Sequence, residues 1–114
     1  MITFMKAWAG ALVALVALIA LDGPALAAEH FVDQHDLMFA PGSVTIKAGD
    51  TVRFTDTDRI THNITIVNPD GTSEDKGMST FSEHIVVQFD KPGVYKVICR
   101  IHPDMKMTIT VEEH

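Results

Sequence analysis

Apolar and polar residues alternate along most of the chain, and this pattern predicts β-strands. Clusters of Gly, Pro, Asn and Asp interrupt the alternation every ten or so residues, as turns between short strands do. From about residue 30 onwards no stretch keeps a 3.6-residue apolar period for three turns, so we expect no helix there. The alternating segments, each a predicted strand, are 44–46, 52–54, 62–67, 85–89, 95–99 and 107–111.

The spacing of these segments favours one small β-domain. Six or seven short strands with turns every 8–12 residues are typical of an antiparallel sandwich or a small barrel. Two polar stretches are predicted as loops, a short one over 56–61 and the longest one over 68–77. The sequence contains no internal repeat and no linker, so we predict a single domain.

The N-terminus has a different pattern, which predicts a secretory signal peptide. Residues 7–21 are an unbroken apolar run of 15 residues, whereas a membrane span needs about 20. A Gly-Pro pair follows, and small residues stand at both cleavage positions in 25–27. We therefore predict a signal peptide over 1–27 and a mature, periplasmic domain over 28–114. An uncleaved N-terminal anchor is the alternative.

Charge and cysteine content restrict the partners. The formal net charge is −6 and Lys and Arg are not clustered, which argues against a nucleic-acid partner. Cys99 is the single cysteine of the sequence, so it cannot form an internal disulfide. A free thiol is a liability in an oxidising compartment, and we expect Cys99 to be buried or bound to something.

Three residues near the C-terminus form a candidate metal-binding motif. Cys99, His102 and Met105 follow one another at intervals of three, where a predicted strand runs into a loop that contains proline. Thiolate, imidazole and thioether groups together suit copper. His62 begins a predicted strand after a polar loop and is the candidate fourth ligand. Two His and one Cys with a weak axial Met form a type-1 copper site, which transfers electrons.

Other chemistries fit these residues less well. A structural zinc site usually needs two or more thiols, and the sequence has one. A Cys–His nucleophilic pair is conceivable, but no third residue is evident to orient the histidine. We therefore expect no enzymatic activity. A β-sandwich interaction module that binds no metal is a further alternative.

Several motifs carry a resemblance to a known family. The chain resembles the small cupredoxins, the amicyanins more than the pseudoazurins and plastocyanins, over roughly residues 31–112. The matching segments are Gly49-Asp50-Thr51-Val52-Arg53-Phe54, His62-Asn63, Pro92-Gly93-Val94-Tyr95 and Cys99-x-x-His102-Pro103-x-Met105. The beginning of the mature chain is shorter than in amicyanin, so the first strand is expected over about 30–34.

The resemblance implies a fold, a cofactor and partners. The implied fold is an all-β, cupredoxin-like Greek-key β-sandwich of six to eight short strands. One type-1 copper per chain is implied, with His62, Cys99, His102 and Met105 as ligands, and Asn63 would steady the ligand loop. The implied function is to shuttle single electrons between a redox donor and acceptor, such as a dehydrogenase and a c-type cytochrome. We expect a monomer that has no membrane contact after cleavage of the signal peptide.

Two questions concern the metal, and the first is which methionine is the axial ligand. Pseudoazurin and plastocyanin place more residues between the His and the axial Met, which would select Met107. Met107 shares a face with Ile109 and Val111 and is therefore predicted to be in the core, so we predict Met105 as the axial ligand.

The second question concerns His30, His35 and Met38, which are further candidate donors. If the mature chain begins at Ala28, its amine, two backbone amides and the His30 imidazole could bind cupric ion in a square plane. Such a second site would point to copper tolerance or delivery, the alternative to electron transfer.

Overall fold

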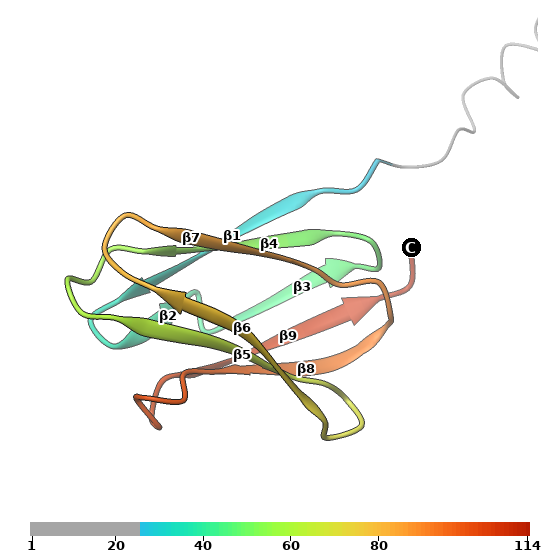
Figure 1. Cartoon of the computed structure of the whole chain (residues 1–114). Helices are drawn as coiled ribbons and strands as arrows, with labels where there is room; N and C mark the ends of the chain where they lie inside the picture. Colours follow the sequence, from blue (N-terminus) through green and yellow to red (C-terminus); the bar gives the residue numbers. More distant parts are fainter. Residues whose placement is uncertain (1–25) are drawn as a thin grey trace, which may run out of the picture.

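The described part of the protein is a sandwich of two β-sheets (Figure 1). The computed structural model describes residues 26–114, so the predicted signal peptide lies almost wholly outside the described residues. In that range no helix could span a membrane. Nine strands are formed there: β1 (Glu29–His35), β2 (Met38–Ala40), β3 (Ser43–Lys47), β4 (Thr51–Asp56), β5 (His62–Val67), β6 (Ser73–Ser79), β7 (His84–Gln88), β8 (Gly93–Ile98) and β9 (Lys106–Glu112).

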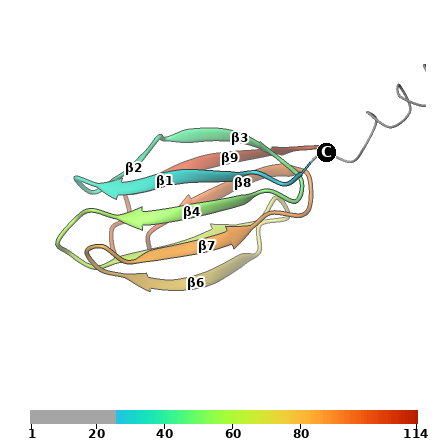
Figure 2. The ribbon, with the colours of Figure 1, turned by 90° about the horizontal axis from the view of Figure 1, so that it is seen from above.

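The chain crosses repeatedly between the sheets, as a Greek-key sandwich requires. One sheet has the order β2-β1-β4-β7 and the other has the order β3-β9-β8-β5-β6 (Figure 2). β1 pairs with β4 and β3 pairs with β9 in parallel, and the other neighbours are antiparallel. Both sheets are therefore mixed, and the expectation of a purely antiparallel sandwich is wrong for these two pairs.

The all-β sandwich is confirmed, but the strand count is higher than the predicted six to eight. All six alternating segments lie in or overlap strands, and the first strand, Glu29–His35, extends slightly beyond 30–34. The prediction of a loop over 68–77 is wrong in part, because β6 begins at Ser73. β6 is an edge strand whose first four residues are exposed. Its backbone pairs with β5 while most of its side chains face water, so it needs no apolar alternation.

The apolar core lies between the sheets, and at one end of the sandwich buried polar residues replace the apolar ones. Phe54 is fully buried and packs edge-to-face against Phe39, with 6.2 Å between the ring centroids. At the end of the sandwich opposite the C-terminus, loops follow β1, β4 and β8 (Figure 1). All the buried polar residues of the described range except Asp50 belong to strands that reach this end, namely Gln34, Asp56, His62, Asn63, Thr65 and Ser79. Such groups must find partners inside the protein, and this end contains the candidate site.

Candidate metal centre

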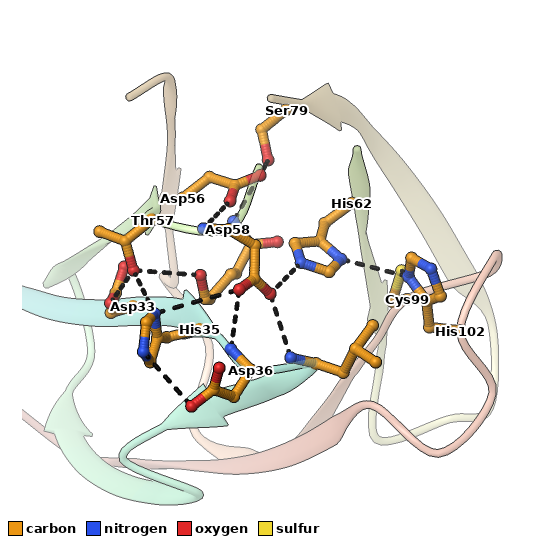
Figure 3. Close-up of polar contacts among 12 residues, drawn as sticks. Asp33, His35, Asp36, Asp56, Thr57, Asp58, His62, Ser79, Cys99 and His102 are labelled. Carbon is orange, nitrogen blue, oxygen red and sulfur yellow. Dashed lines mark hydrogen bonds and ion pairs between the residues drawn. The ribbon is translucent and has the colours of Figure 1, made fainter. Parts of the chain in front are cut away.

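Three of the four predicted ligands converge at the polar end of the sandwich. His62 is the first residue of β5, Cys99 directly follows β8, and His102 lies in the loop between β8 and β9. β5 and β8 pair from Thr65 opposite Ile98, so the residues before Thr65 and after Ile98 emerge at the same end. Figure 3 shows the His62 and His102 rings and the Cys99 sulfur facing one another.

The spacing of these donor atoms fits a bound metal ion. His62 Nδ1 lies 3.2 Å from His102 Nδ1, and Cys99 Sγ lies 3.5 Å from the same nitrogen. All three donor atoms lie within 4.8 Å of one another. Metal–nitrogen bonds of about 2.0 Å and metal–sulfur bonds of about 2.3 Å place trigonal ligands about 3.5–3.8 Å apart. The mixed sulfur and imidazole set is one that copper accepts.

The ligand loop is closed by its own backbone. The N–H of Cys99 donates to the carbonyl of Met105 (3.1 Å), His102 N–H donates to Cys99 O (3.3 Å), and Met105 N–H donates to His102 O (2.9 Å). These bonds hold Met105, which is buried, at the end of the same loop. Met107 instead lies inside β9, opposite Val97, and is part of the apolar core.

Asn63 ties the ligand loop to β5 and β6. Its side-chain oxygen accepts hydrogen bonds from the Arg100 N–H (3.2 Å) and from the Thr65 hydroxyl (2.7 Å). Its amide nitrogen donates to Asp75 Oδ1 and to the Gly77 carbonyl, both at 3.0 Å. Its backbone N–H points to the Cys99 sulfur at 3.3 Å. Asn63 therefore joins the ligand loop, through Arg100, to β6, through Asp75 and Gly77, which agrees with the loop-steadying role that the resemblance implied.

Asp58 is a residue of the site that the sequence did not reveal. The His62 ring donates through Nε2 to Asp58 Oδ2 at 2.7 Å, and His62 is fully buried. Burial opposes ionisation of Asp58, but hydrogen bonds from the Leu37 N–H, the His62 ring and the Asp36 N–H outweigh it and lower the pKa of the Asp58 carboxyl. The only available signal was a carboxylate four residues before a predicted histidine ligand.

Asp56 is a second acidic residue behind the site, and its pKa is shifted in the opposite direction to that of Asp58. It accepts hydrogen bonds from the Asp58 N–H (2.9 Å) and from the Ser79 hydroxyl (3.3 Å), and its side chain is fully buried. Burial raises the pKa of the Asp56 carboxyl above its ordinary value. The loop over 56–61 thus begins at a buried acid, Asp56, and contacts His62 through the partly exposed Asp58.

Of the additional donors near the N-terminus, His35 and Met38 pair across β1 and β2, and His30 lies apart from them. The Ala28 N–H and the His30 ring occupy the two oxygens of Asp50, each at 2.9 Å. Hydrogen bonds from the Ala28 N–H, the His30 ring and the Lys47 N–H lower the pKa of Asp50 to about 2. His35 lies at the far end of β1, and five residues of extended strand separate it from His30 by about 17 Å.

Comparison with known proteins identifies the class of protein. Residues 27–112 match the copper-binding proteins of the plastocyanin/azurin family, and the chain belongs to this family. Its cofactor is therefore copper, and the group formed by His62, Cys99 and His102 can hold it.

Particular relatives are similar over most of the chain. A putative pseudoazurin of Rhizobium leguminosarum bv. viciae is 36% identical, covering 90% of this chain and 72% of the relative. Amicyanin-alpha of Methylorubrum extorquens is 35% identical, covering 93% of this chain and 97% of the relative. The crystal structure of amicyanin from Paracoccus versutus superimposes with a TM-score of 0.68 at 28% identity, covering 82% of this chain and 88% of that one.

Proposed function

We propose that the protein is a periplasmic type-1 copper protein that carries single electrons between redox proteins. The proposed ligands are His62, Cys99 and His102, with Met105 as the axial ligand. The convergence of two imidazole nitrogens and one sulfur, in a chain of a copper-binding family, is the observation that carries this proposal. When bound in such a set, copper supplies one-electron redox chemistry.

The ligand residues are held in a way that suits electron transfer. His62 and Cys99 are buried, and the loop that carries Cys99 and His102 is closed by backbone hydrogen bonds. A donor set fixed by its surroundings moves little when the charge at its centre changes, so reorganisation is small and exchange is fast. Nothing in this arrangement requires a substrate cleft, and we propose no catalysis of its own.

A redox partner would dock where His102 reaches the surface. His102 is half-buried, whereas His62 and Cys99 are covered. Leu37 (47% exposed) and Ile101 (48% exposed) line one small recess together with His102. This apolar surface would accept a donor such as a dehydrogenase and an acceptor such as a c-type cytochrome. The predicted signal peptide over 1–27 would bring the domain, residues 28–114, to these partners in the periplasm.

Titration with cupric ion tests the proposal. The absorption spectrum of the protein is recorded while one equivalent of cupric ion is added, and Cys99→Ser is titrated in parallel. We expect an intense thiolate-to-copper band that saturates at one equivalent, bleaches with reductant and is missing in Cys99→Ser. A weak band that survives in Cys99→Ser would refute the type-1 site and favour copper tolerance or delivery through other donors.

The axial ligand is tested separately with a matched pair of methionines. Met105→Leu should shift the intensity ratio of the visible bands and raise the reduction potential, because an additional axial donor stabilises the cupric state more than the cuprous state. Met107→Leu replaces a core methionine of β9 with a residue of similar volume, and it should leave both quantities unchanged. The reverse result would transfer the axial role to Met107.

A further inference from the structure

We propose that Asp58 is a positioning residue that orients His62 for the metal and joins this ligand to the turn between β1 and β2. The proposal rests on the proposed function, in which His62 is a copper ligand. It concerns one carboxylate that meets a ligand ring and two backbone amides at the same time. Figure 3 shows Asp58 between the His62 ring and the turn that carries Asp36.

The contacts of Asp58 use both of its oxygens. Oδ2 accepts from His62 Nε2 at 2.7 Å and from the Leu37 N–H at 3.0 Å, while Oδ1 accepts from the Asp36 N–H at 2.8 Å. His35 Nδ1 is a further neighbour, 4.0 Å from Oδ1. The Asp58 side chain is 13% exposed and the His62 side chain is fully buried. Little water therefore competes for the short bond between them.

The bond to Asp58 decides which nitrogen of His62 is free. A carboxylate only accepts hydrogen bonds, so in the neutral His62 ring the proton is on Nε2 and Nδ1 keeps its lone pair. Nδ1 is the atom that lies 3.2 Å from His102 Nδ1. A carboxylate behind a ligand histidine also raises the basicity of the ligand and fixes the ring orientation. Asp58 thus presents His62 in the one tautomer that can bind a metal here.

The Asp58 carboxylate also holds the turn between β1 and β2, whose residues do not favour its left-handed backbone conformation. Asp36 (φ 53°) and Leu37 (φ 61°) are both left-handed, and a two-residue turn of this kind normally has Gly at the second position. A side chain such as that of Leu37 makes this conformation costly. Successive N–H groups in such a turn point to one side and form an anion-binding concavity. Asp58 fills this concavity.

Leu37 connects the turn to the ligand loop. Its side chain lines a recess shared with Ile101, His102 and Met105. Asp58 therefore fixes His62 from behind and, through the turn, places an apolar side chain beside His102. A role of Asp58 in the metal site and a role confined to turn stability predict different results for substitutions.

The experiment compares Asp58→Ala and Asp58→Asn with Asp36→Asn. Asp36→Asn is the matched control, because it removes one negative charge from the same turn, its side chain is 81% exposed, and Asn tolerates a positive φ. We expect Asp58→Ala to weaken cupric binding about 10–100-fold and to raise the reduction potential. If only the affinity for cupric ion falls, each tenfold loss of affinity raises the reduction potential by about 59 mV. Asp58→Asn keeps an acceptor without the charge and should fall between Asp58→Ala and wild type.

A readout without copper separates this proposal from the proposed function. In the copper-free protein, NMR of the imidazole nitrogens reports the tautomer of His62. We expect a single Nε2–H form in wild type and Asp36→Asn, and a mixture of tautomers in Asp58→Ala. If wild type shows no type-1 band but keeps this difference, the proposed function fails while the positioning of His62 by Asp58 stands.

A double substitution tests for a merely structural role. Leu37→Gly relieves the left-handed turn and should restore stability lost in Asp58→Ala, because Gly adopts positive φ without penalty. Copper affinity and the His62 tautomer should not recover in the double variant. Recovery of both would overturn the proposal, and so would an Asp58→Ala variant that matches Asp36→Asn in tautomer, affinity and potential.

Discussion

Removal of the Asn63 side chain should destabilise the protein strongly, even without copper. Asn63→Ala deletes four hydrogen bonds, two of them accepted from Arg100 N–H and the Thr65 hydroxyl and two donated to Asp75 and Gly77. A net value of about 0.5–1.5 kcal/mol for each gives a range of about 2–6 kcal/mol. Asp75 is exposed, so water partly replaces its bond. We expect a loss of about 3 kcal/mol in the free energy of unfolding.

Such a loss is large for a domain of this size. Small domains have total stabilities of about 5–15 kcal/mol, and 1 kcal/mol shifts their melting temperature by about 4–8 °C. The variant should therefore melt roughly 12–24 °C below wild type. The assay is urea unfolding of the copper-free protein, followed by far-ultraviolet circular dichroism. Amide hydrogen exchange should also show faster exchange at Arg100, since its N–H loses the acceptor that holds the ligand loop.

Asn68→Ala is the matched control for this substitution. Asn68 donates two hydrogen bonds as well, to the Thr72 hydroxyl and to Glu74, but all of these groups lie in an exposed loop and an edge strand. Water replaces such bonds, and we expect a loss below about 0.5 kcal/mol. If Asn63→Ala loses no more than Asn68→Ala, or if exchange at Arg100 is unchanged, the network around Asn63 does not stabilise the ligand loop.

Three further predictions concern the sandwich itself. Hydrogen bonds lower the pKa of Asp50 from its ordinary 3.8 to about 2. The ionised Asp50 therefore contributes its full stabilisation above pH 3.8, and this stabilisation is lost as the pH falls through about 2. Unfolding measured against pH should show this loss in wild type, and the pH-dependent loss should be absent in Asp50→Asn. Phe54→Ala empties a fully buried site and should cost about 3–5 kcal/mol in urea unfolding, whereas Phe31→Ala, at a site 63% exposed, should cost less than about 0.5 kcal/mol. Gly93→Ala should cost about 1–3 kcal/mol in thermal unfolding, because Gly93 has φ 147° and a Cβ would meet Pro69 at 2.6 Å; an unchanged melting temperature would contradict that geometry.

The strands that face the core were predictable, because burial on one side imposes a pattern. His62–Val67 is a strand with the bounds that were predicted, and Ile109 and Val111 face the core as their alternation indicated. β6 and β2 gave no such signal. β6 is polar because most of its side chains face water, and β2, with three residues, is too short to show a period. Backbone pairing with β5 makes β6 a strand, and in β2 the single buried residue, Phe39, is too few to form a sequence pattern.

The candidate site was predictable as far as residue chemistry is specific. Cys99, His102 and Met105 stand close together in the sequence, and few functions other than metal binding need that combination. The role of Asp58 was hidden because aspartates are common in polar loops. Its contacts with Asp36 and Leu37 also join segments 21 and 22 residues apart in the sequence. The parallel pairing of β3 with β9 could not be predicted for the same reason, because the register between distant segments depends on the whole fold.

The polar edge strand β6 also bears on how the protein behaves in a crowded compartment. Each open sheet exposes two edge strands whose free N–H and C=O groups can pair with another chain and start aggregation. On β6 the exposed residues Glu74, Asp75 and Lys76 place charges along that edge, and a second copy that approached edge to edge would have to bury them. At the edge of the other sheet, β2 offers only three residues. The features that made β6 and β2 hard to predict are therefore those that hinder pairing with a neighbouring molecule at these two edges.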